Sequence, residues 1–235
     1  VMSVLKREDY ITSNHRGHGH CLDKGLYALY SMDNNSLKNF TKDACRNMRL
    51  FVSGSAPLLT ETFNTFKELT GETILERYGM SETVMLTSNP CTSDERFGGA
   101  SQRTGCSVGF PLPGVELRIV SDKSEVLGTG EVGSIQVKGA NVFAGYWRMP
   151  EKTAQEFTSD GYFITGDMGF IDTDGSVQLV GREKDLIISG GLNVYPAEVE
   201  ALLDDRADVA EAAVIGVADA EGLTKTKAFV VLIGT

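Results

Sequence analysis

A strand–helix–strand succession between residues 49 and 78 constrains the fold more than any other pattern in the chain. Residues 49–53 (RLFVS) form a short apolar run that ends in the tight loop GSAP. Residues 58–70 then carry apolar side chains near helical spacing, up to a glycine. The run TILERY reads as a second strand that stops at Gly79. This order predicts a βαβ-like unit, and the loop after its second strand is where such sheets place ligands.

The remainder of the chain predicts short strands separated by glycine and proline. Two segments alternate as half-buried antiparallel strands do, and DTDG at residues 172–175 is a hairpin turn signal. After Gly181 the pattern becomes strand, helix, strand and strand, which indicates the start of a small α+β domain. The predicted elements are strands 115–121, 133–138 and 177–180, strand 186–189, helix 196–203, and strands 212–217 and 228–233. The fold class is therefore α/β and α+β: a βαβ sheet with a small antiparallel β region, followed by an incomplete α+β domain.

Composition excludes several classes of protein. The 235 residues are 41% hydrophobic, which is enough to bury a core, and the net charge of −10 argues against binding to nucleic acid. No apolar run is long enough to span a bilayer. The four cysteines lie far apart without a C-x-x-C pair, as free thiols in a reducing compartment do. We expect an intracellular protein, cytoplasmic or mitochondrial, and the start at Val1 suggests a partial chain.

The three histidines gather in one polar segment near the start of the chain. His15, His18 and His20 stand beside Cys21 in HRGHGHC, and imidazoles and a thiol this close together could ligate a metal. Two glycines within the segment and the lack of a second ligand pair favour an exposed loop or a mis-joined segment. The role of this cluster stays open.

The hexapeptide YGMSET follows the second predicted strand and offers groups suited to a nucleotide. Tyr78 can stack on a planar base, and Gly79 lets the backbone turn. Ser81 offers a hydroxyl to a phosphate, while the Glu82 carboxylate is a hard oxygen ligand of the kind that Mg²⁺ prefers. An ordinary turn with a surface glutamate is the alternative interpretation.

Two further groups could contact a ribose. Asp167, in YFITGD, stands just past a glycine in an expected turn, where its carboxylate could accept two ribose hydroxyls; it could equally bond its own backbone. Arg182 presents a planar fork of donors for ribose or phosphate oxygens. The alternative for Arg182 is a surface ion pair with Glu183 or Asp185.

The stretch GREKDLIISGGLNVYPAEVE, residues 181–200, combines a charged turn, a strand, a glycine pair and a helix start. Gly190 and Gly191 allow close backbone approach of a ligand or a positive φ, although a plain hairpin turn explains them as well. The proline and the acidic residues of PAEVE suit the first turn of a helix, which is a structural role. The stretch as a whole has the character of a hinge.

The order of these motifs, rather than any one of them, carries a family resemblance. From about residue 39 to residue 235 the chain resembles the adenylate-forming acyl-CoA synthetases. The matching motifs are SGSAPL, RYGMSET, GEVGSIQVKGANVFAGYW, YFITGD and GREKDLIISGGLNVYPAEVE. NMRLFVSGSAPLL, ILERYGMSET, NVFAGYWRMPEKT and GGLNVYPAEVE look most like malonyl-CoA synthetases within that superfamily. The resemblance implies that residues 39–183 are part of the AMP-binding large domain and that residues 184–235 begin the small mobile domain, with residues 1–38 unmatched.

The same resemblance implies a role for each matched residue. Ser81 and Glu82 would be catalytic, with Ser81 at the α-phosphate, where the family usually has threonine, and Glu82 on Mg²⁺. Lys184 would be the hinge, and Gly190 and Gly191 would line the CoA channel. The residues implied in ATP or AMP binding are Ala56, Pro57, Tyr78, Gly79, Ser81, Asp167 and Arg182.

The implied reaction is ATP-dependent acid–CoA ligation, with a small carboxylic acid, ATP and CoA as substrates and Mg²⁺ as cofactor. For malonate, the second carboxylate would need a cation, for which Arg77 is the leading candidate and Arg49 the next. The alternative for Arg77 is an ion pair with Glu76 or Glu72.

Two elements that the resemblance implies have no counterpart in the chain: a phosphate loop ending in Lys-Gly, and a catalytic lysine late in the small domain. We therefore expect a part of a longer ligase. The alternatives are a truncated, non-catalytic nucleotide-binding or interaction protein, and a related adenylating enzyme with another acid or acceptor. The sequence does not indicate an oligomeric state.

Overall fold

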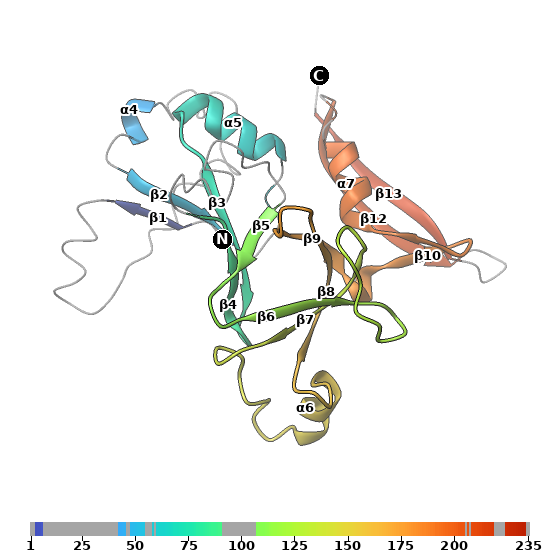
Figure 1. The fold of residues 1–235 in the computed structure, drawn as a ribbon. Helices are drawn as coiled ribbons and strands as arrows, with labels where there is room; N and C mark the ends of the chain where they lie inside the picture. Colours follow the sequence, from blue (N-terminus) through green and yellow to red (C-terminus); the bar gives the residue numbers. More distant parts are fainter. Residues whose placement is uncertain are drawn as a thin grey trace. The chain divides into compact units, whose positions relative to one another are not determined.

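The computed structural model describes residues 3–6, 42–45, 48–54, 58, 60–90, 107–204, 206, 208–218 and 224–233 (Figure 1). The chain divides into two compact units. Unit 1 comprises residues 1–115 and 140–143, and unit 2 comprises residues 116–139 and 144–235. The strands are paired in parallel and antiparallel fashion in unit 1 and antiparallel in unit 2, so the fold class is mixed α/β with few helices, as predicted.

Within unit 1 the strands follow the order β1-β2-β3-β4-β5. Strands β2 and β3 are parallel, and the other neighbouring pairs are antiparallel. The described elements are β1 (Ser3–Lys6), α4 (Lys42–Cys45), β2 (Met48–Ser53), α5 (Thr60–Thr70), β3 (Ile74–Met80), β4 (Val84–Ser88) and β5 (Ser107–Pro111).

The predicted strand–helix–strand unit is confirmed, because helix α5 connects the parallel strands β2 and β3. Helix α5 lies against these strands (Figure 1). Phe51 of β2 meets Phe66 of α5 edge to face, with ring centroids 4.8 Å apart. Both rings are buried, and burial of each contributes about 1.5–3 kcal/mol. The core of this unit contains Cys45, Phe51, Leu58, Phe63, Phe66 and Ile74.

Within unit 2 the first four strands follow the order β9-β8-β7-β6, and their neighbouring pairs are antiparallel. The predicted hairpin at residues 172–175 is confirmed between β8 and β9, with Gly175 at a φ of +86°. The described elements of this part are β6 (Glu116–Val120), β7 (Gly133–Lys138), α6 (Pro150–Glu156), β8 (Phe163–Ile171) and β9 (Val177–Arg182).

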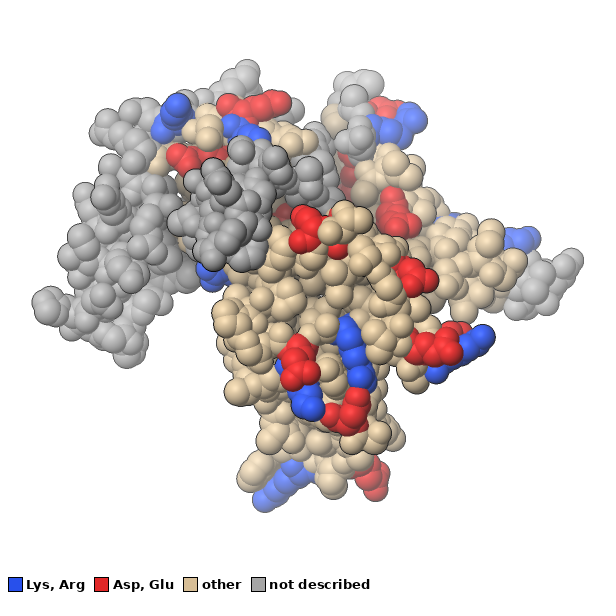
Figure 2. Space-filling model, viewed as in Figure 1, with Lys and Arg blue, Asp and Glu red and all other residues tan. Residues whose placement is uncertain are grey.

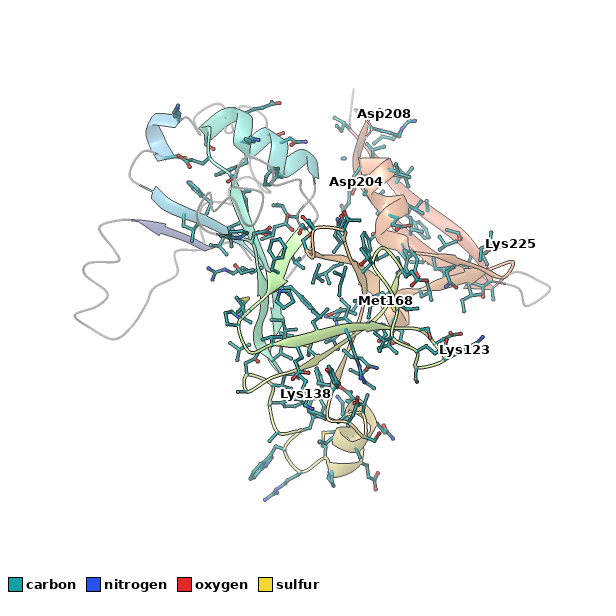
Figure 3. The ribbon with its side chains drawn as sticks, in the orientation of Figure 1. Lys123, Lys138, Met168, Asp204, Asp208 and Lys225 are labelled. Atoms are coloured by element: carbon teal, nitrogen blue, oxygen red, sulfur yellow. The ribbon has the colours of Figure 1, made fainter. Side chains whose placement is uncertain are left out.

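After β9 the chain forms a small α+β arrangement within unit 2. Helix α7 packs against β12, and the Val214 amide donates to the Glu200 carboxylate at 2.8 Å. Strands β12 and β13 form an antiparallel ribbon whose ends are marked by Asp208 and Lys225 (Figure 3). The elements are η3 (Glu183–Asp185), β10 (Ile187–Ser189), β11 (Leu192–Val194), α7 (Pro196–Asp204), β12 (Val209–Ala218) and β13 (Thr224–Leu232).

Two expectations about local structure are wrong. Strand β3 continues through Gly79 to Met80 instead of stopping at Gly79. Residues 163–167 of the YFITGD motif lie in the long strand β8 rather than in a turn, because they pair with β7 and β9; Gly166, with a φ of +72°, lies inside a bulge of that strand. The expected domain boundary between residues 183 and 184 falls inside unit 2 and stays a prediction. Within the described residues, no helix is both long enough and apolar enough to cross a membrane.

Candidate functional site

The predicted site residues fall into two groups, one in each unit. Unit 1 holds those of the RYGMSET motif, and unit 2 holds those of YFITGD and of residues 181–200. Ala56 and Pro57, assigned to the adenine pocket, lie outside the described residues, and so does the cluster of His15, His18 and His20. The two described groups are built differently and are taken in turn.

The RYGMSET motif forms the hairpin between β3 and β4. Met80 and Thr83 close its turn, because the Thr83 amide donates to the Met80 carbonyl at 3.2 Å and the Met80 amide donates to Thr83 Oγ1 at 3.3 Å. Thr83 is fully buried, whereas Ser81 is exposed and Glu82 is half-buried. Ser81 is therefore exposed at the tip of the hairpin and Glu82 is partly exposed, while the buried Thr83 anchors the turn.

Gly79 is required by close packing rather than by a turn. A Cβ at this position would collide with the carbonyl oxygen of Val84 on the facing strand β4. The register of β3 and β4 also shifts between Tyr78 and Gly79, so the glycine marks a bulge. Tyr78, immediately before the bulge, is buried with 6% of its surface exposed. The aromatic ring is thus held in the sheet at the base of the hairpin.

Val84, the first residue of β4, has a φ of +56°. A β-branched residue rarely adopts this left-handed conformation, and strain of this kind costs about 1–3 kcal/mol. The sequence analysis did not identify Asn141, which forms hydrogen bonds to the backbone on both sides of Val84. Asn141, in the loop after β7, donates its Nδ2 hydrogens to the carbonyls of Thr83 at 2.8 Å and Met85 at 2.9 Å.

Arg77 lies on β3 and is half-buried. Among the described residues its Nε is a buried donor without a hydrogen-bond partner. Buried donors are nearly always satisfied, so an unsatisfied one calls for an explanation. No described ion pair joins Arg77 to Glu76 or Glu72, the partners considered as the alternative. Of Arg49, the next candidate, only the backbone position in β2 is described.

In unit 2, Asp167 and Arg182 form an ion pair across β8 and β9. Arg182 Nε lies 2.8 Å from Asp167 Oδ1, and the Asp167 side chain is 8% exposed against 53% for Arg182. The two residues occupy facing positions of the antiparallel ladder. The partner of Arg182 is therefore Asp167, not Glu183 or Asp185 as the alternative interpretation had it.

A bulge in β8 orients the Asp167 side chain toward Arg182. Ser134 of β7 pairs with Met168 (labelled in Figure 3), while Gln136 pairs with Ile164, so β8 has extra residues between these points. Thr165 fastens the bulge: its hydroxyl donates to the Ile135 carbonyl at 2.9 Å and accepts the Asp167 amide at 3.1 Å. The carboxylate position thus depends on a threonine side chain as well as on the glycine after it.

The remaining predicted residues lie on exposed turns. Lys184 is exposed on the 3-10 helix η3 that follows β9. Gly190 and Gly191 connect β10 to β11, with φ of +59° and +82°, and no heavy atom lies within 4 Å of a Cβ built on either. These values match a two-residue hairpin turn of type I′, the structural alternative for the pair. Their assignment to a CoA channel stays a prediction.

A charged network at residues 158–162 was not predicted. Arg118 forks onto the Asp160 carboxylate, with distances of 2.6 and 3.1 Å, and lies 3.8 Å over the Tyr162 ring. Lys138, labelled on β7 in Figure 3, donates to the Asp160 carbonyl at 3.0 Å. Figure 2 shows acidic and basic side chains intermixed on this face of unit 2.

The network shifts two titrations. The Arg118 hydrogen bond, helped by Thr158, lowers the pKa of Asp160 to about 2. The hydrogen bond that the Tyr162 hydroxyl donates to Glu116 raises the pKa of Tyr162. In unit 1, burial and the nearby Glu72 raise the pKa of the Cys45 thiol, which is a free cysteine as predicted.

Comparison with known proteins places the chain. The sequence model of the AMP-binding enzyme family matches residues 21–147, more than half of the chain. The match begins inside residues 1–38, for which the motifs gave no counterpart.

Individual relatives extend the likeness. A malonate–CoA ligase of Arabidopsis thaliana is 38% identical over 191 residues, or 81% of this chain and 30% of that protein. A long-chain-fatty-acid–CoA ligase of Bacillus subtilis is 40% identical over 182 residues, or 77% and 31%. ATP-bound MatB from Rhodopseudomonas palustris shares 48% identity with a TM-score of 0.78, over 85% of this chain and 39% of that one. The chain thus spans about a third of the length of these curated relatives.

Proposed function

The chain belongs to the AMP-binding enzyme family, and from this we propose that it is part of an ATP-dependent acid–CoA ligase that activates malonate. The 48% identity to the ATP-bound structure of MatB supports the use of ATP, and the 38% identity to a malonate–CoA ligase of Arabidopsis thaliana carries the choice of malonate. The likeness to that structure also confirms the predicted fold, the mixed sheet of the large domain of adenylate-forming enzymes.

Each group of predicted residues would have its own role toward the nucleotide. Tyr78 would contact the adenine, and the Ser81 hydroxyl would donate to the α-phosphate. Asp167 would accept the ribose hydroxyls, with Arg182 beside it. The 2.8 Å ion pair supports this assignment, because a carboxylate already fixed by a guanidinium is positioned for further hydrogen bonds.

The residues present fit a magnesium ion. Mg²⁺ is usually held by one or two carboxylates together with the substrate phosphates, and not by a cage of protein ligands. No cluster of three or more His, Cys, Asp or Glu ligands occurs among the described residues, while Glu82 offers a single carboxylate on the hairpin. Bound there, Mg²⁺ would neutralise charge on the phosphates.

The first half-reaction would join the acid to AMP. A carboxylate oxygen of the acid attacks the α-phosphorus, the bond from that phosphorus to the bridging oxygen of the β-phosphate breaks, and pyrophosphate leaves. No protein nucleophile is needed, so the contribution of Ser81 and Arg182 would be orientation and neutralisation of charge.

The second half-reaction would transfer the acyl group to CoA. The thiol sulfur attacks the acyl carbon and loses its proton, and AMP leaves with the electrons of the broken acyl–oxygen bond. Lys184, exposed just after β9, would be the hinge between the two half-reactions, and Gly190 and Gly191 would border the pantetheine channel.

Arg77 is the candidate that would distinguish malonate from a monocarboxylic acid. Malonate keeps a second, unreacted carboxylate that needs a cation in the acyl pocket. The buried Nε of Arg77, without a partner among the described residues, is a donor for such a group. A fatty acid has no second carboxylate to accept a hydrogen bond from this donor.

The test is ATP–pyrophosphate exchange by the protein that carries this chain in its complete coding sequence. We expect exchange that depends on malonate, and an Arg77→Ala variant that loses malonate-dependent exchange while its AMP affinity is kept. Arg206→Ala, which removes an exposed arginine, is the matched control and should behave like the unchanged protein.

Two outcomes would redirect the proposal. Exchange supported by fatty acids and not by malonate would favour the chemistry named for the Bacillus subtilis relative. AMP binding without exchange for any acid would favour a non-catalytic nucleotide-binding protein of the same lineage.

A further inference from the structure

The hairpin that carries Ser81 and Glu82 is strained at Val84. Its turn, residues 80–83, is followed by a residue in the left-handed conformation, the first residue of β4. Glycine or asparagine normally occupies that position, because a β-branched residue there is disfavoured. Valine with a φ of +56° keeps this shape only if other contacts hold it.

The hydrogen bonds within the turn are too long to be those contacts. The Thr83 amide lies 3.2 Å from the Met80 carbonyl, and the Met80 amide lies 3.3 Å from Thr83 Oγ1. Both distances are at or beyond the long end of the range for N–H···O bonds. The turn therefore closes weakly on itself.

Asn141 supplies short bonds on both sides of the strained residue. Its Nδ2 donates to the Thr83 carbonyl at 2.8 Å and to the Met85 carbonyl at 2.9 Å. Two carbonyl oxygens can be served only by the amide nitrogen, so the chemistry fixes the orientation of the side chain. The Thr83 carbonyl belongs to the peptide unit whose orientation sets φ of Val84, and rotation out of the left-handed region would break this bond.

The backbone of the same loop holds the third carbonyl. The Phe143 amide donates to the Glu82 carbonyl at 2.8 Å. Together, Asn141 and Phe143 occupy the carbonyls of residues 82, 83 and 85, while the Ser81 side chain stays exposed. The loop thus fixes the backbone of the hairpin without covering that hydroxyl.

We propose that Asn141 is a positioning residue for the nucleotide: it holds the Ser81–Glu82 turn in its strained form, in which those side chains contact the α-phosphate and Mg²⁺. We call the hydrogen bonds from Asn141 and Phe143 to the carbonyls of residues 82, 83 and 85 the clamp. The clamp is inferred from the geometry of unit 1, and the identity of the ligand rests on the proposed function. Asn141 itself touches neither ATP nor metal in this proposal.

The clamp can be tested without any ligand. In Asn141→Ala, the amides of residues 83–86 should exchange hydrogen with solvent faster, while those of helix α5 should not change. Asn64→Ala, which removes an exposed asparagine from α5, is the matched control and should leave the hairpin amides unchanged. Unchanged hairpin exchange in Asn141→Ala would overturn the clamp whatever the protein binds.

The positioning role is tested by binding of ATP at varied Mg²⁺ concentration. In Asn141→Ala, the dissociation constant for Mg·ATP should rise roughly tenfold, and half-maximal ATP binding should need more Mg²⁺. Asn141→Asp should be worse than the alanine variant, since its oxygens face two carbonyl oxygens. Adding Val84→Gly to Asn141→Ala should restore most of the affinity, because glycine adopts the left-handed conformation without strain.

A purely structural role would give another result. In that case Asn141→Ala would have a lower melting temperature but the same Mg·ATP affinity as the unchanged protein, and adding Val84→Gly would not change that affinity. This result would overturn the positioning role. If the unchanged protein binds no ATP, the proposed function fails, and hydrogen exchange still decides on the clamp.

Discussion

Two hairpins that carry predicted site residues obtain their shape in opposite ways. The β10–β11 turn consists of Gly190 and Gly191, both at positive φ with open space around them. The β3–β4 turn places Val84 at positive φ and needs Gly79 and Asn141 to accommodate it. The first turn is determined by its own residues, whereas the second depends on residues from elsewhere in the chain.

The difference teaches where a site can be sensitive to distant substitutions. A self-determined turn responds mainly to changes in its own residues, because its conformation does not require contacts from elsewhere in the chain. A turn held by partners transmits a change at any of them to the side chains it carries, here Ser81 and Glu82. The second kind can hold a geometry that the local sequence would not adopt alone.

The largest effect is expected from Gly79→Ala. The new Cβ would collide with the Val84 carbonyl and approach the Met85 Cα to 3.0 Å, and a backbone cannot yield as a flexible side chain can. We expect a loss of about 4 kcal/mol in the free energy of unfolding of unit 1, at the upper end for single substitutions. Urea denaturation measures this loss, and hydrogen exchange of the amides in β3 and β4 shows whether it arises in the hairpin.

Gly181→Ala is the control for this prediction. Gly181 has no heavy atom within 4 Å of its Cβ position and no positive φ, so the change should stay within about 0.5 kcal/mol of the unchanged protein. Equal costs for the two alanine variants would show that close approach is not what requires Gly79.

A smaller loss in the free energy of unfolding is expected from Arg182→Ala. This variant tests whether a site residue of unit 2 also depends on a partner from another strand. The substitution leaves the nearly buried Asp167 carboxylate without its guanidinium. Loss of a hydrogen bond to a charged group costs about 2 kcal/mol. Chemical denaturation measures the loss, and Arg206→Ala, which breaks a pair exposed on both sides, should cost much less than Arg182→Ala. Equal losses would mean that the bulge of β8 fixes Asp167 unaided.

Gly190→Ala should cost about 1 kcal/mol, the penalty of a side chain in the left-handed region. The effect should stay local to β10 and β11, because no heavy atom lies within 4 Å of a Cβ built on Gly190. Hydrogen exchange of the hairpin amides measures it. Gly191→Asn is the control, since asparagine tolerates this conformation better, and a cost as large as that of alanine would contradict the argument from φ.

The sequence predicted the self-determined features well. The apolar spacing of residues 58–70 predicted helix α5, DTDG predicted the β8–β9 hairpin, and the glycine pair allowed the β10–β11 turn. Each of these signals is local, so propensity and periodicity are sufficient to find it.

The features that depend on partners were not predictable. Nothing near Val84 indicates a left-handed residue, and its partner Asn141 is 57 positions away in the chain. Likewise, YFITGD lies in a strand because β8 pairs with β7 and β9, and the Thr165 hydroxyl donates to the Ile135 carbonyl of β7. The motif residues themselves were found by resemblance, but their ion pair and their clamp are properties of the folded chain.

The smallest effect concerns the turn at residues 158–162, which combines both strategies. Gly161 supplies a φ of +87°, and Arg118 and Lys138 supply partners for Asp160. Carboxyl titration by NMR should give Asp160 a pKa of about 2, against 3.8 for the free side chain, because the charged form accepts the Arg118 hydrogen bonds. A lowered folded-state pKa adds stability that is present above the unfolded value, and it is lost as pH falls from about 4 to about 2.

The Arg118→Gln variant separates the partner from the glycine. It should return the pKa of Asp160 toward 3.8, whereas Arg206→Gln should leave that pKa unchanged. The turn itself should persist in Arg118→Gln, since Gly161 and the bond between the Thr158 amide and the Tyr162 carbonyl are kept. If the turn amides exchange as fast as unfolded chain in that variant, the turn is held by its partners, as the β3–β4 hairpin is, and its glycine is not sufficient.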